Sequence, residues 1–145
     1  MPHEHKIVRR VEFSETDMAG IVHFSNYFRF AESVEHDFFR TIGHSIVTKT
    51  TDPPVGWPRV HASFDFQAPL RFEDEFEVHL MVAEKKSRTL SYQIIVRKLT
   101  DGDPVVCAKG KLTVVCVTRD STGKMSASEI PSEIADRIEV APEPG

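Results

Sequence analysis

The sequence predicts an α+β domain in which one long helix packs against a curved antiparallel sheet of five strands. The first observation is that residues 26–42 carry apolar side chains at helical spacing. The second is that one earlier and four later segments alternate apolar and polar residues, as antiparallel strands do when one face lies on a core. The chain has 145 residues, 40% of them hydrophobic and 28% charged, which suits a single globular domain over residues 1–145.

The first expected strand covers residues 6–14. Its apolar residues Ile7, Val11 and Phe13 fall on one side because their spacing has a period of two. A loop then leads to the helix, and it is unusually apolar for a loop. Its large apolar residues are Ile21, Val22 and Phe24. We therefore expect this loop to be buried rather than to lie over the surface.

The helix is expected over residues 26–42. Its apolar positions recur three or four residues apart: Tyr27, Phe30, Ala31, Val34, Phe38 and Ile42. Ser25 or Asn26 can cap its first turn through a side-chain oxygen. Gly43 suits the left-handed residue that often follows a helix.

Four further strands follow a loop over residues 44–56. They are expected at 59–68, 75–83, 89–99 and 105–118. The Asp101-Gly102 pair predicts a hairpin between the last two strands, and residues 85–88 form the preceding tight connection. The last run is long, so the sheet must coil strongly. Open sheet edges in so small a domain favour pairing with a second copy.

The core is expected over about residues 6–118, followed by a polar tail over 121–145 with one short helix in 130–140.

The net charge of −4 argues against binding to nucleic acid or to an anionic membrane surface. No apolar run is long enough to span a bilayer, and the first residues lack the apolar segment of a secretory signal. Cys107 and Cys116 are expected to be buried free thiols, which fits a reducing cytoplasm.

The most informative candidate for chemistry is Asp17, which stands in the apolar loop just before the helix. The first N–H groups of a helix have no internal partner and carry partial positive charge, so they can hold a polarised carbonyl oxygen. A carboxylate facing such a carbonyl is the minimal equipment for hydrolysis by acyl transfer. The alternative is that Asp17 only forms the turn.

The segment from Phe13 to Phe30 reads F-x-x-T-D-x-A-G-I-V-x-F-x-N-Y-F-x-F. This pattern resembles the signature of the hotdog-fold thioesterases, in particular the 4-hydroxybenzoyl-CoA thioesterase and YbgC-like acyl-CoA thioesterase group. The segment Ala68-Pro69-Leu70-Arg71-Phe72-Glu73-Asp74 is similar to the same group, and the resemblance spans about residues 6–118. It implies a helix wrapped by its sheet, dimers with a ten-stranded sheet, and dimers that often pair into tetramers.

The resemblance also implies an activity, the hydrolysis of acyl-CoA to a carboxylate and free CoA at a site between two subunits. Asp17 matches the catalytic carboxylate, as nucleophile or as general base, and the backbone N–H of Phe24 matches the group that binds the thioester oxygen. His23 is a further candidate, although many YbgC-like members carry a histidine one position later.

The remaining candidates fall into two groups. The acyl-pocket candidates are Asn26, Trp57 and His61. The candidates for contact with the phosphates of CoA are Lys85, Lys86 and Arg88. The resemblance implies no metal and no redox cofactor. Two alternatives remain, a non-catalytic acyl-CoA-binding hotdog protein and a hotdog dehydratase or hydratase, and the sequence does not select the acyl group.

Overall fold

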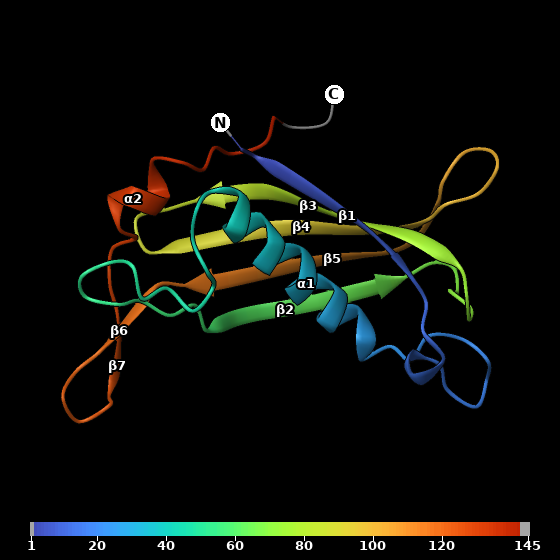
Figure 1. Ribbon diagram of the computed structural model, residues 1–145, viewed down its shortest axis with the longest axis horizontal. Coiled ribbons are helices and arrows are strands. Elements are labelled where there is room, and N and C mark those ends of the chain that lie inside the picture. Colours follow the sequence, from blue (N-terminus) through green and yellow to red (C-terminus); the bar gives the residue numbers. More distant parts are fainter. Residues whose placement is uncertain (1, 143–145) are drawn as a thin grey trace.

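The computed structural model describes residues 2–142 and shows one long helix lying across a five-stranded antiparallel sheet (Figure 1). The helix is α1 (Asn26–Thr41). The sheet has the order β1-β3-β4-β5-β2. Its strands are β1 (Glu4–Arg10), β2 (Arg59–Phe66), β3 (Glu75–Lys85), β4 (Thr89–Lys98) and β5 (Val105–Val115). The predicted hotdog arrangement is therefore confirmed.

Helix α1 buries the apolar stripe that its periodicity predicts. The fully buried side chains of this stripe include Phe30, Val34, Phe38 and Phe39, and they pack on residues of β3 and β4 in one continuous core. Gly43 takes a φ of +88°, as expected for the residue after a helix.

The first strand ends earlier than the sequence predicts. After Arg10 the chain leaves β3, and Val11 exchanges backbone hydrogen bonds with the loop at Glu73 and Asp74. A short 3₁₀ helix, Phe13–Glu15, follows, and the Phe13 side chain is 75% exposed. The prediction that Phe13 continues a strand face was wrong, because the strand stops where its partner turns away.

The loop before α1 is only partly buried. Val22 is 4% exposed, as predicted, but Phe24 is 61% exposed within one protomer. Burial of the whole loop was therefore a wrong expectation for an isolated chain.

The long last run, 105–118, breaks at Cys116. The N–H of Cys116 donates to the carbonyl of Arg88 at 2.7 Å, and the chain then enters a second, two-stranded sheet of β6 (Val117–Arg119) and β7 (Met125–Ala127). Both cysteines are buried and free, as expected, and burial raises the pKa of each thiol.

The segment after β7 packs against the domain instead of extending as a polar tail. The short helix α2 (Ser132–Ala135) lies within the range expected for it. Ile130, Ile134 and Ile138 join the core, which therefore extends beyond residue 118. Arg137 Nη1 donates to the carbonyl of Ile42 at 2.6 Å, which ties this segment to the chain just after α1.

Strand β2 forms one edge of the sheet, and β5 is its strand partner within residues 2–142. Val60 and Phe66 on this edge strand are 63% and 50% exposed. An exposed edge with large apolar side chains is suited to pairing with another strand. No helix in the described part of the chain is long and apolar enough to cross a bilayer.

Candidate active site

Asp17 lies in a tight turn that connects the 3₁₀ helix to α1. Its N–H donates to the carbonyl of Ile21 at 2.9 Å, and its carbonyl accepts from the N–H of Gly20 at 3.0 Å. Gly20 has a φ of +81°, a conformation that glycine adopts without strain. Asp17 Oδ1 accepts the N–H of Ala19 at 2.9 Å, so Asp17 does form the turn. Within residues 2–142 its second oxygen, Oδ2, has no hydrogen-bond partner and is left for chemistry.

A cavity of about 530 Å³ lies beside this turn. Two loops at the same end of the molecule build it, the loop before α1 and the loop after β2 (Figure 1). The N–H of Val22 donates to the carbonyl of Leu70 at 2.8 Å, which joins the two loops directly. The lining residues are Asp17, Ile21, Val22, Phe24, Tyr27, Phe66, Gln67, Ala68, Pro69 and Arg71. The structure thus brings Asp17 and Phe24 to one mostly apolar cavity.

The backbone N–H of Phe24 is the unpaired donor of this region. The other N–H groups from Val22 to Tyr27 donate to acceptors at 2.8–3.3 Å: Leu70 O, Glu15 O, His23 Nδ1, His23 O and Phe24 O. No acceptor among the described residues takes the Phe24 N–H. It precedes the first turn of α1, where the helix dipole adds partial positive charge. It is therefore available to a carbonyl oxygen of a ligand.

His23 and Asn26 flank this donor without lining the cavity. The His23 ring is hydrogen-bonded to Ser25 Oγ at 2.7 Å and lies against the Phe24 ring, with centroids 4.5 Å apart. Ser25 occupies the capping position of α1, but its side chain makes no capping hydrogen bond. Asn26 is buried and donates from Nδ2 to the carbonyl of Glu15 at 2.8 Å.

Trp57 and His61 lie away from Asp17 within the protomer. Trp57 is buried against Phe39, donates to Thr48 Oγ1 at 3.1 Å, and lines a separate cavity of about 620 Å³ near the other end of α1. His61 is exposed and hydrogen-bonded to Ser63 at 3.0 Å. Phe64, three residues further along β2, packs on Phe28 of α1. Because side chains alternate between the two faces of a strand, His61 points to the opposite face of the sheet.

The three basic candidates lie in the β3–β4 hairpin, at the end of the sheet opposite the loop before α1 (Figure 1). Lys85 Nζ donates to the carbonyls of Ala135 and Ile138 at 2.9 and 2.7 Å, so it holds the C-terminal segment. Lys86 pairs with Glu84 at 2.8 Å, and Arg88 is exposed. One protomer therefore does not bring these cations to the Asp17 cavity.

The structure adds lining residues that the sequence analysis missed. Tyr27 and Phe66 supply aromatic walls with ring centroids 5.0 Å apart, and burial raises the pKa of Tyr27 to about 12. Gln67 and Arg71 add polar groups. Arg71 belongs to the segment of residues 68–74 that resembles the thioesterase group, so the sequence marked this segment. The sequence did not show that Arg71 lies close to Asp17, because that depends on the contact between the two loops.

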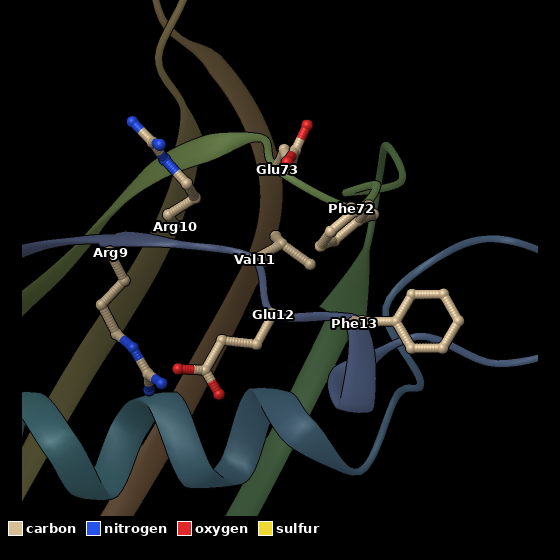
Figure 2. Close-up of a pocket in the computed structure, with 7 residues that line it drawn as sticks. All are labelled: Arg9, Arg10, Val11, Glu12, Phe13, Phe72 and Glu73. Atoms are coloured by element: carbon tan, nitrogen blue, oxygen red, sulfur yellow. The ribbon is translucent and has the colours of Figure 1, made fainter.

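A neighbouring cavity of about 520 Å³ lies near the end of β1 (Figure 2). The positive and negative charges that line it are equal in number, and they come from Arg9, Arg10, Glu12 and Glu73. Phe13 and Phe72 form an edge-to-face pair there, with centroids 5.6 Å apart. The residues lining this cavity do not include Asp17. Across residues 2–142, no group of three or more histidine, cysteine or acidic side chains is arranged to hold a metal ion.

Residues 11–138 match the family model described as the thioesterase-like superfamily. The chain belongs to this superfamily. It is 35% identical over 128 residues to a putative esterase from Aquifex aeolicus, covering 88% of this chain and 92% of that relative. It is 29% identical over 133 residues to a 1,4-dihydroxy-2-naphthoyl-CoA hydrolase from Nostoc punctiforme, covering 90% of this chain and 84% of the relative.

Comparison with solved structures shows the same fold. The structure of 4-hydroxybenzoyl CoA thioesterase from Pseudomonas sp. strain CBS-3 superimposes with a TM-score of 0.83 at 20% identity, covering 94% of this chain and 99% of that one. As a member of the thioesterase-like superfamily with this fold, the protein is a thioester hydrolase.

Proposed function

We propose that this thioesterase hydrolyses an acyl-CoA to a carboxylic acid and free CoA, with Asp17 and the Phe24 N–H as the reacting groups. The observation that carries the proposal is that two residues line the same cavity at the start of α1: Asp17, whose carboxylate has one unpartnered oxygen, and Phe24, whose backbone N–H is unpaired. The names of curated relatives support CoA thioesters as the substrate class, because they include an acyl-CoA thioesterase, YbgC, of Haemophilus influenzae.

The chemistry follows from the two groups. The thioester oxygen accepts the Phe24 N–H, and the developing negative charge gains from the helix dipole. Asp17 Oδ2 then either attacks the carbonyl carbon, to give an anhydride that water opens, or takes a proton from the attacking water. In both routes one water is consumed, the carbon–sulfur bond breaks, and the thiolate of CoA is protonated. A single oxyanion donor is typically worth about 2.7–4 kcal/mol of the barrier.

The site is completed by a second copy of the chain in this proposal. Two β2 edges that pair about a two-fold axis run antiparallel, so the Arg59 end of one strand lies beside the Phe66 end of the other. Trp57 precedes β2, and Gln67 follows it at the Asp17 cavity. The segment of the partner that contains Trp57 then lies beside the acyl pocket. The exposed Val60 and Phe66 support this pairing, and two such dimers can form a tetramer.

The other candidate residues differ in how well their contacts suit a role in this assembly. Lys86 and Arg88 stay candidates for the phosphates of CoA, because their side chains are exposed, whereas Lys85 is engaged by the C-terminal segment. Asn26 positions the loop, His23 stays a candidate catalytic residue beside Phe24, and His61 stays a candidate for the acyl pocket across the subunit boundary. We propose a cytoplasmic location, because both cysteines are free thiols.

The test measures release of CoA thiol from a panel of acyl-CoAs by the wild type, by Asp17→Asn and by the control Asp101→Asn. Asp101 is exposed in the hairpin between β4 and β5 and is not among the residues lining the Asp17 cavity. We expect Asp17→Asn to lower kcat by about 100-fold or more while acyl-CoA binding persists, and Asp101→Asn to stay close to the wild type. Equal turnover by wild type and Asp17→Asn contradicts the role of Asp17. Tight binding by the wild type without thiol release contradicts the hydrolase assignment.

A further inference from the structure

We propose that Arg71 binds a free carboxylate at the far end of the acyl group, so that the preferred substrates are dicarboxylic acyl-CoAs. This inference rests on the proposed function, because it takes the Asp17 cavity as the place where the thioester binds.

The position of Arg71 is held by its backbone. The N–H of Arg71 donates to Asp74 Oδ2 at 2.8 Å, and its carbonyl accepts the N–H of Asp74 at 3.0 Å. The preceding residue, Leu70, is fully buried and accepts the N–H of Val22 from the Asp17 loop. The base of the Arg71 side chain is therefore fixed relative to the turn that carries Asp17.

The guanidinium of Arg71 has no ionic partner within residues 2–142, although acidic residues surround it in sequence. Asp74 is taken by the Arg71 N–H and by Lys98, whose Nζ lies 3.5 Å from Oδ1. Glu75 is paired with Arg10, and Glu73 lines the neighbouring cavity of Figure 2. Among the residues lining the Asp17 cavity, Arg71 is the single cation. An arginine offers only donors, so its natural ligand is an acceptor supplied by the substrate.

The size of the cavity assigns this ligand to the acyl group rather than to the phosphates of CoA. A sphere of about 530 Å³ is about 10 Å across, and Asp17 and Arg71 both lie on its wall. The arm of CoA separates the thioester sulfur from the first phosphate by roughly 15 Å when extended. Because Arg71 and Asp17 line one cavity of about this width, the Arg71 guanidinium suits the end of a short acyl chain better than those phosphates.

A carboxylate is the group that the guanidinium fork matches best, through two parallel hydrogen bonds. In a five-carbon diacid the two carboxyl carbons are roughly 5 Å apart, and contacts of about 3 Å at each end bring the span close to the width of the cavity. The methylene groups between them would pack on the aromatic and aliphatic walls formed by Tyr27, Phe66 and Val22. The side-chain amide of Gln67 offers a further donor on the same wall.

The experiment compares glutaryl-CoA with pentanoyl-CoA, which have the same number of acyl carbons and differ in the terminal carboxylate. The enzymes are wild type, Arg71→Gln, Arg71→Lys and Arg40→Gln. Arg40 is an exposed arginine in the last turn of α1 that lines neither the Asp17 cavity nor the Trp57 cavity, so it serves as the control for lost charge. We expect the wild type to favour glutaryl-CoA in kcat/KM by about ten-fold or more. Arg71→Gln should lose about ten-fold on glutaryl-CoA and change little on pentanoyl-CoA, Arg71→Lys should recover part of the loss, and Arg40→Gln should resemble the wild type.

An equal loss on both thioesters in Arg71→Gln overturns the inference, because Arg71 would then act on the reacting carbonyl or on CoA. No loss on glutaryl-CoA, no preference for it in the wild type, or no turnover of it at all overturns the inference as well. Turnover of pentanoyl-CoA that depends on Asp17 would show that the proposed function stands when this specificity fails.

Discussion

The side-chain amide of Asn26, the first residue of α1, donates to the backbone carbonyl of Glu15 at 2.8 Å. The same carbonyl accepts the N–H of His23 at 2.9 Å. Glu15 itself is held by its carboxylate, which accepts the N–H of Glu12 at 2.8 Å and pairs with Arg9 at 3.3 Å. The Glu15 carbonyl thus joins the segment before Asp17 to the start of α1. It therefore helps to fix the position of the Asp17 carboxylate relative to the Phe24 N–H.

Asn26→Ala removes the side-chain donor from this carbonyl at a buried position. We expect a loss of about 1–3 kcal/mol in the free energy of unfolding, because a partly buried acceptor loses a partner, and a lower kcat because the two reacting groups lose alignment. Ser25→Ala is the matched control for stability, since the Ser25 side chain makes no capping bond and only an exposed hydrogen bond to the His23 ring, and it should cost less than about 0.5 kcal/mol. Urea denaturation and thiol release measure both effects. A larger loss for Ser25→Ala than for Asn26→Ala contradicts this account.

Gly20→Ala should disturb the turn that carries Asp17. A side chain at φ +81° costs about 1–2 kcal/mol even though the Cβ meets no atom within 4 Å. Gly123→Ala is the control, because Gly123 has a φ of +85°, equally open surroundings and a place between β6 and β7. Both variants should lose similar stability in thermal melts, whereas only Gly20→Ala should lose kcat/KM. Equal kinetic losses in the two variants would sink the link between the turn and catalysis.

Glu35 lies fully buried in the middle of α1, where Arg59 donates to Oε1 at 2.9 Å and Oε2 has no partner in the described chain. Burial raises the pKa of this carboxyl, against the opposing effect of Arg59. The unfolded chain therefore releases this proton first, and the contribution of Glu35 to stability falls as the pH rises above its ordinary pKa of 4.5.

The corresponding measurement is the free energy of unfolding of the wild type and of Glu35→Gln at about pH 4 and about pH 8. Glu35→Gln does not titrate at this position, so its stability relative to the wild type should increase from the lower to the higher pH. A relative stability that decreases over this range would show that ionised Glu35 is stabilised by Arg59 more than it is penalised by burial.

Lys85 and Lys86 are adjacent but differ in their contacts, and substitution should separate their roles. Lys85→Met removes both bonds to the carbonyls of Ala135 and Ile138 and should cost about 1–2 kcal/mol of stability, loosening the C-terminal segment. Lys86→Met removes an exposed charge paired only with the exposed Glu84, so it should leave the thermal midpoint nearly unchanged. It should raise the KM for acyl-CoA if the proposed contact of Lys86 with a phosphate of CoA is made. Thermal melts and initial rates at low and moderate salt measure both. A change of KM in Lys85→Met alone contradicts this assignment.

The fold could be predicted because its signals are local. The period of apolar residues in α1 and in the later strands, and the place of Gly43, depend only on neighbours in sequence. The break at Cys116 could not be predicted, because it follows from a hydrogen bond to Arg88, which lies in another hairpin. The apolar residues Ile130, Ile134 and Ile138 had helical spacing, but charged neighbours made that segment look solvated.

The candidate site was predicted in part for the same reason. Asp17 and Phe24 belong to one continuous motif, and the structure brings them to one cavity. Arg71 reaches the same cavity only because Val22 and Leu70 pair across a long separation in sequence, which periodicity does not encode. Trp57 and the basic hairpin lie at the other end of the chain from Asp17, and only the proposed pairing of two chains would relate them to it.

The tie between the two ends of the chain has a consequence for engineering. The N–H of Glu139 donates to the carbonyl of Pro2 at 2.9 Å, and Figure 1 shows the segment after α2 passing the start of β1 at one corner of the sheet. A short linker across this corner would therefore suit a circular permutant with new ends opened in the exposed 100–104 hairpin. Such a protein would keep every strand pairing of the sheet while removing both free ends from this corner.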